Sequence, residues 1–79
     1  MIDKPWQAGW VVEVTRTAKE LGEVTQTLYF DVAIKNASEA TAAATRKSGL
    51  AGATGRTVRP LTSNEIEMSG LKVGEARPS

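Results

Sequence analysis

The sequence predicts an α+β fold, in which a three-stranded, mainly antiparallel sheet carries one helix packed on one face. Two stretches alternate apolar and polar residues with a period of two, which is typical of strands with one buried face. A run without this alternation follows, and it starts at a helix-capping residue and ends at a glycine. A shorter apolar stretch comes next. The predicted order is therefore β-β-α-β, followed by a short C-terminal helical turn.

The first two strands are expected at residues 8–17 and 25–34. Both are rich in β-branched and aromatic residues, and their large apolar side chains fall on alternate positions. The charged loop between them contains Gly22, which predicts a hairpin with a positive φ at that glycine. Seven large apolar side chains are thereby expected on one face of the sheet: Trp10, Val12, Val14, Leu28, Phe30, Val32 and Ile34.

A helix is expected over residues 37–48. Asn36 is placed to be its N-cap with Glu39 three residues later, and Gly49 is placed to end it. The apolar side chains of this segment are all alanines, and each of them buries little area. We therefore expect the helix to cover the seven large side chains incompletely. The C-terminal segment or a second copy of the chain would complete the cover, which predicts a homodimer.

The third strand is expected at residues 56–61, with Val58 facing inward, and Pro60 marks it either as an edge strand or as ending there. Thr62 and Glu65 have the spacing of a capping box, which predicts a short helix or a single helical turn after this strand. Residues 72–79 end in glycine, proline and serine and are expected to be frayed. The ordered core of this single domain, residues 1–79, would thus cover about residues 8–71.

The composition of the 79 residues excludes several classes of protein. Hydrophobic residues make up 41% and charged residues 24%, which is ordinary for a globular domain. The chain has no cysteine and no histidine, which excludes disulfides, zinc sites of the Cys/His kind and the common Ser-His-Asp and Cys-His nucleophile systems. We expect no enzymatic activity, no cofactor and no metal. No apolar run reaches the length of a signal peptide or a membrane span, so a cytoplasmic location without membrane contact is expected.

Two polar features have ordinary explanations. Glu13 and Asp31 fall on the wet face of the sheet, with Lys35 as the nearest base, and solvated surface charges explain them better than a catalytic carboxylate pair. The glycines of residues 49–55 match neither G-x-x-x-x-G-K-[ST] nor G-x-G-x-x-G, and they follow a helix rather than precede one. We interpret this segment as a helix C-cap and a flexible connection.

The middle of the chain is basic. Residues 40–64 contain four basic residues and no acidic one, namely Arg46, Lys47, Arg56 and Arg59. Such a cluster binds nucleic-acid phosphates or a protein partner, or it is simply solvated. The isoelectric point of about 8.1 is below the value of about 9 that is typical of nucleic-acid-binding domains, and no aromatic residue lies between these bases. Both observations favour the second and third interpretations.

The leading functional hypothesis is a non-catalytic protein-interaction or accessory module that acts through a sheet edge or through the region of Trp6. This tryptophan has no place in the strand pattern, so it either folds over the sheet or serves as an exposed interface anchor. A protein partner is expected, and a second copy of the chain is one such partner. The alternative is a nucleic-acid-binding protein that contacts phosphates through Arg46, Lys47, Arg56 and Arg59.

Overall fold

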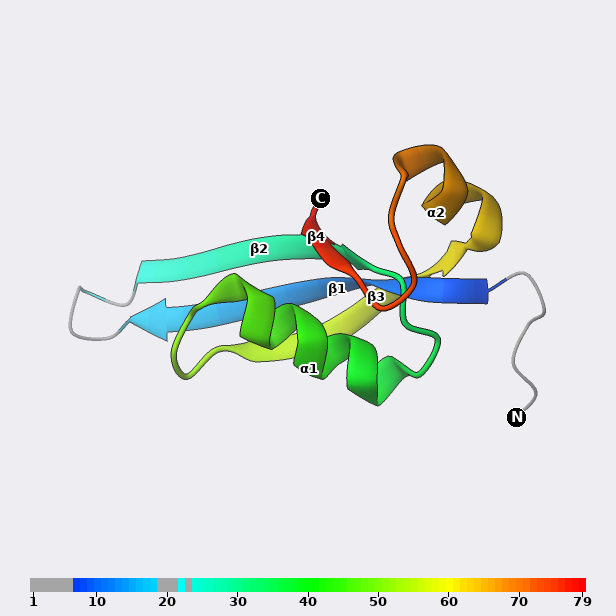
Figure 1. Cartoon of the computed structure of the whole chain (residues 1–79). Coiled ribbons are helices and arrows are strands. Elements are labelled where there is room, and N and C mark those ends of the chain that lie inside the picture. The colour runs from blue at the N-terminus through cyan, green and yellow to red at the C-terminus, as the bar shows by residue number, and fades with distance from the viewer. Residues whose placement is uncertain (1–6, 19–21, 23) are drawn as a thin grey trace.

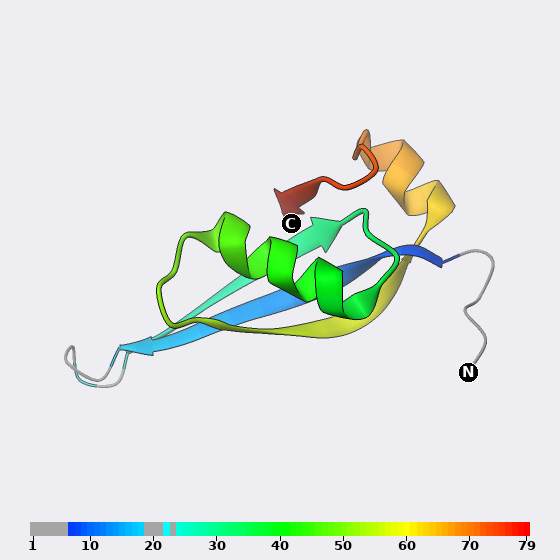
Figure 2. The same ribbon diagram turned by 60° about the horizontal axis from the view of Figure 1, so that its bottom comes forward.

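An antiparallel sheet with a helix on each face forms the fold, and the computed structural model describes residues 7–18, 22 and 24–79. The strands follow the order β3-β1-β2-β4, and each neighbouring pair is antiparallel. Figures 1 and 2 show α1 lying along one face of the sheet and α2 at one end of the other face. The predicted α+β class is confirmed. The elements are β1 (Gln7–Ala18), β2 (Val24–Val32), α1 (Ala37–Ser48), β3 (Thr54–Thr62), α2 (Ser63–Ser69) and β4 (Ala76–Pro78).

The main core lies between α1 and the sheet. Four of the seven side chains predicted to face inward are buried there, with exposed fractions of 0 to 3%. Trp10 and Ile34 pack at the margin of this cluster, and the Trp10 indole Nε1 donates a hydrogen bond to the Lys35 carbonyl over 2.9 Å. Leu28 lies farther out and is 41% exposed. The four buried side chains are Val12, Val14, Phe30 and Val32.

Small residues allow α1 to cover this face closely. Ala40 and Ala44 are fully buried against the sheet. A Cβ atom on Gly55 would lie 2.6 Å from Thr45 Oγ1 and 2.8 Å from Thr41 Cγ2, so glycine at this position lets the helix approach β3. The close approach of α1 covers the centre of this face, and Ala76 of the C-terminal segment packs against the same core, which is one of the two expected ways of completing the cover. The homodimer prediction loses this argument.

A second, smaller core lies under α2 on the opposite face. Ile66 from α2 packs with Leu61 from β3, Val11 from β1 and Leu71 from the segment after the helix. All four are buried, with exposed fractions of 4 to 9%. This cluster covers one end of the face only. The remainder of the face is therefore the part of the sheet that no helix covers.

The prediction of three strands and a frayed C-terminus is wrong. Residues 76–78 form β4, which pairs with the last residues of β2. Ala33 N–H donates to the Glu75 carbonyl over 2.9 Å, and Ser79 N–H donates to the Tyr29 carbonyl over 2.8 Å. Local sequence does not favour a strand with a proline in it. The open edge of β2 supplies the hydrogen bonds that hold the segment in place.

The third strand is longer than predicted, and its inward residue is a different one. Val58 is 48% exposed because it is the extra residue of a β-bulge, where Val11 pairs with Arg59 and Val12 pairs with Thr57. Thr57 therefore lies opposite Val12, and the prediction that Val58 faces inward is wrong. The edge position of the strand that contains Pro60 is confirmed by the strand order.

The predicted helix ends are confirmed. The Asn36 side chain accepts a hydrogen bond from Glu39 N–H, and Gly49 ends α1 with a φ of 69°. Thr62 and Glu65 form the complete capping box at the start of α2. Gly22 has the predicted positive φ, at 80°, whereas residues 19–21 and 23 of the hairpin loop lie outside the described residues.

Replacing Gly55 by alanine is expected to lower the free energy of unfolding by about 1–3 kcal/mol, because the new Cβ overpacks against α1. Urea unfolding followed by circular dichroism measures the change. The same substitution in a Thr41→Ala/Thr45→Ala background is the control, and it is expected to cost less since the opposing atoms are gone. Equal losses in the two backgrounds would show that the close approach of α1 is not the constraint.

Candidate functional site

The four basic residues predicted as a cluster are divided between the two faces of the sheet. Arg46 and Lys47 lie in the last turn of α1, on the helix-covered side. Arg56 and Arg59 project from β3 onto the other face, where both bind carboxylates. The fold brings the second pair near acidic side chains and leaves the first pair apart from it. Trp6, the predicted interface anchor, lies outside the described residues.

A row of three polar side chains crosses the uncovered face. Glu13 on β1 lies directly between Tyr29 on β2 and Arg56 on β3. Arg56 Nε donates to Glu13 Oε1 over 2.8 Å, and the Tyr29 hydroxyl donates to Glu13 Oε2 over 3.0 Å. The Glu13 side chain is only 18% exposed, compared with 72% for Arg56. The hydrogen bonds from Arg56 and then Tyr29 lower the pKa of Glu13, and the bond to Glu13 raises the pKa of Tyr29.

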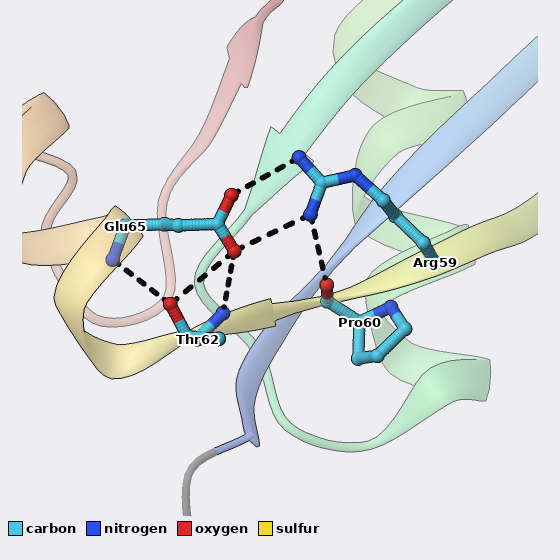
Figure 3. Close-up of polar contacts among 4 residues, drawn as sticks. All are labelled: Arg59, Pro60, Thr62 and Glu65. Carbon is cyan, nitrogen blue, oxygen red and sulfur yellow. Dashed lines mark hydrogen bonds and ion pairs between the residues drawn. The ribbon is translucent and has the colours of Figure 1, made fainter.

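A second polar cluster ties β3 to α2. The guanidinium of Arg59 donates to both carboxylate oxygens of Glu65, over 3.3 and 3.1 Å, and also to the Pro60 carbonyl (Figure 3). Glu65 Oε1 also accepts from Thr62 N–H and from the Thr62 hydroxyl. These contacts lower the pKa of Glu65, chiefly through Arg59. Sequence reasoning assigned Glu65 to the helix cap alone, and nothing in the local pattern pointed to Arg59 as its partner.

Glu13 and Asp31 share the uncovered face but do not lie opposite each other. Asp31 pairs across the strands with Val11, whereas Glu13 pairs with Tyr29. Within the described ranges, no group of three carboxylates is placed to hold a metal ion. Nor is any helix in those ranges long and apolar enough to cross a lipid bilayer.

A groove of about 570 Å³ lies on this face, between α2 and the sheet. Its apolar lining includes Val11, Leu61 and Ile66, and its charged lining is Asp31 together with the Arg59–Glu65 pair. Met68 from α2 stands at its side and is 81% exposed. The groove volume is within the usual range for ligand sites, about 300–1,000 Å³.

The outer edge of β2 is only partly paired. β4 lies beside residues 30–32, and none of the described residues forms a strand beside residues 25–28. The bonds of Ala33 to Glu75 and of Tyr29 to Ser79 show that the odd-numbered residues of β2 direct their backbone groups outward. By this alternation, Thr25 and Thr27 each present an outward N–H and C=O.

The two edges of the sheet differ in the features that discourage pairing with a further strand. The outer edge of β3 carries a bulge at Val58, a proline at Pro60 and the charged side chains of Arg56 and Arg59, which are features that discourage strand pairing. Residues 25–28 of β2 read Thr-Gln-Thr-Leu and contain neither a charge nor a proline. An adjoining groove of about 400 Å³ has Leu28, Lys47 and Pro78 in its lining. Over residues 25–28 the edge of β2 therefore has neither of these two features that discourage strand pairing, a charge or a proline.

Tyr29 is the only tyrosine of the chain, so its titration is read directly from the ultraviolet absorbance of the phenolate. We expect a midpoint above the ordinary value of 10.0, because the bond to the Glu13 carboxylate stabilises the protonated hydroxyl. In the Glu13→Gln variant the midpoint is expected to move down. An equal midpoint in the two proteins would contradict the pairing of Tyr29 with Glu13.

Glu13 is also expected to make the free energy of unfolding depend on pH in the acid range. The pKa of Glu13 in the folded chain is below its ordinary value of 4.5, so its contribution to stability is present above about pH 4.5 and is lost as the pH falls through the folded pKa. Urea unfolding at a series of pH values should show that the free energy of unfolding falls more steeply below pH 4.5 for the wild type than for Glu13→Gln. Arg56→Gln, which removes the partner, should make the same fall less steep. Parallel curves would exclude the role of this ion pair.

Comparison with known proteins gives no match: neither a protein-family model, nor a curated protein, nor a solved structure matches the chain. The function is therefore argued from the geometry of the uncovered face and of the β2 edge.

Proposed function

We propose that this protein is a non-catalytic interaction module that binds an extended segment of a partner protein along the outer edge of β2. The observation that carries the proposal is the half-filled strand position beside β2. β4 occupies this position next to residues 30–32, and none of the described residues occupies it beside residues 25–28. Main-chain hydrogen bonds supply the affinity in this mode of recognition, and pockets for alternate side chains supply the specificity.

β4 serves as a template for the partner strand. It runs antiparallel to β2 and bonds to the outward groups of odd-numbered residues. A partner segment in line with β4 would bond in the same way to Thr25 and Thr27. The backbone of β2 is already extended, so this strand needs little further ordering when the partner binds. The entropic cost of binding is lowered accordingly.

The surroundings of the edge define the chemistry of the partner. On the helix-covered face, the groove beside Leu28 and Phe30 accepts an apolar side chain, and Lys47 at the same groove favours an acidic residue next to it. On the other face, threonines border the position, and the hydroxyls of Thr17 and Thr25 lie 3.4 Å apart. We therefore expect an extended segment with one apolar anchor and a nearby acidic residue.

A second copy of the chain could also occupy this edge, through symmetric pairing of two β2 strands. Symmetric pairing of two β2 strands is limited on one side by Ser79 beside Tyr29 and on the other by the start of β2 at Val24. Each copy then contributes few hydrogen bonds. The homodimer and the cytoplasmic location stay predictions. The nucleic-acid-binding alternative also stays a prediction, and the division of the basic residues between the two faces gives it no support.

The unpaired edge is tested first by amide hydrogen exchange of the protein alone. The N–H groups of Thr25 and Thr27 should exchange fast, whereas those of Gln26 and Leu28, which point to β1, should be protected. Peptides of ten residues are then selected from a random display library on the 79-residue chain. Binding of a selected peptide is expected to protect the Thr25 and Thr27 amides.

Thr27→Pro removes the outward N–H while leaving the bonds to β1, and it is expected to weaken such a peptide about tenfold or more. Ser63→Pro is the matched control, since proline is accepted at the first position of a helix and α2 lies away from this edge. A library that yields no binder, or binders that Thr27→Pro does not affect, would refute strand addition at β2.

A further inference from the structure

The groove between α2 and the sheet differs from the strand edge in both composition and position. Its apolar lining includes Val11 and Leu61, which are 9% and 4% exposed. Met68 contributes a flexible apolar side chain that is 81% exposed, and such methionines adapt to the shape of a bound partner. An exposed methionine beside a largely apolar surface is thus available for contact.

Asp31 is the charged group in this groove that its neighbours leave unmatched. It is half-buried, and its carboxylate accepts no hydrogen bond from any residue that the structure describes. The Arg59 guanidinium interacts with Asp31 through long-range charge attraction alone. Its hydrogen bonds go to Glu65 and to the Pro60 carbonyl.

On the other side, Arg77 of β4 pairs directly with Asp31 in the strand register. Its guanidinium nevertheless donates elsewhere, to the Ser69 carbonyl over 2.6 Å, to the Gly70 carbonyl over 3.4 Å and to Glu75 Oε1 over 3.4 Å. The hydrogen bonds of Arg59 and Arg77 therefore go to other groups, and the Asp31 carboxylate keeps its acceptor capacity for a group from outside.

We propose that this groove is a second binding site, which takes a partner segment that carries a lysine or arginine beside a large aliphatic residue. The cation would bind the Asp31 carboxylate, and the aliphatic side chain would pack mainly on the exposed Met68 side chain at the side of the groove. Charge complementarity selects this occupant, because Arg59 and Glu65 neutralise each other and Asp31 is left as the net charge of the groove. The site goes beyond the strand-addition function and does not depend on it.

The groove is open to solvent rather than enclosed, which suits a side-chain pair on a peptide better than a compact small molecule. An anionic ligand would have to displace Glu65 from Arg59, where the carboxylate makes two hydrogen bonds. A purely apolar ligand would bury Asp31 without a partner, which is unfavourable. A ligand with a cation beside an aliphatic group neither displaces Glu65 from Arg59 nor buries Asp31 without a partner.

The test is a titration of isotopically labelled protein, followed by amide NMR shifts, with three capped peptides. The first is acetyl-Leu-Lys-Leu-amide, the second has norleucine in place of lysine, and the third has glutamate there. Shifts of the Asp31, Leu61 and Met68 amides are expected with the lysine peptide, at a concentration about tenfold lower than with the norleucine peptide. Equal binding of the norleucine peptide, or preferential binding of the glutamate peptide, would overturn the proposal.

Two variants locate the site. Asp31→Asn keeps the shape of the side chain and is expected to weaken the lysine peptide about tenfold, whereas Glu67→Gln removes the same charge from an exposed position of α2 outside the groove and should have no effect. Met68→Ser, at a solvent-exposed position, should weaken the same peptide without disturbing the fold. Thr27→Pro should leave this binding unchanged, which separates the groove from the β2 edge. Loss of binding in Glu67→Gln, or none in Asp31→Asn, would contradict the assignment to Asp31.

Discussion

The close packing of α1 on the sheet is the contact on which the rest of the structure depends. Ala40 and Ala44 lie flat against the strands, and Gly55 removes the side chain that would hold the helix away. The large side chains of β1 and β2 are buried under this thin layer with almost no exposed surface. One face of a small sheet is thereby closed within a single chain, although no large residue of the helix contributes to it.

Closing one face in this way leaves the other face available for polar chemistry. α2 covers only one end of it, through Ile66, and the rest is occupied by polar side chains that bind one another across the strands. Arg56 is held by Glu13 and Arg59 is held by Glu65, so the basic residues of β3 are largely neutralised by acids of other elements. Among the described residues of this face, the Asp31 carboxylate accepts no hydrogen bond and Met68 is 81% exposed.

The two edges of the sheet also differ in whether their backbone hydrogen-bonding groups are protected from pairing with a further strand. A bulge, a proline and two arginines guard β3, which is a common protection against unwanted strand pairing. β4 protects β2 only over residues 30–32, and the neutral segment before them keeps outward backbone groups. The two binding sites that we propose rest on these groups, the first on the outward backbone groups of the β2 edge and the second on the Asp31 carboxylate.

The sequence by itself determined the elements whose signals are local. The period of two located β1 and β2, and the caps at Asn36, Gly49 and Thr62 located both helices, because these patterns act over a few neighbouring residues. Only the tertiary structure decided the rest. β4 is a strand because β2 offers it hydrogen bonds, Val58 is exposed because a bulge shifts the register of β3, and Glu13 meets Arg56 across 43 positions of the chain. Such contacts depend on strand register and on how closely a helix packs, and both are set by residues far apart in the sequence.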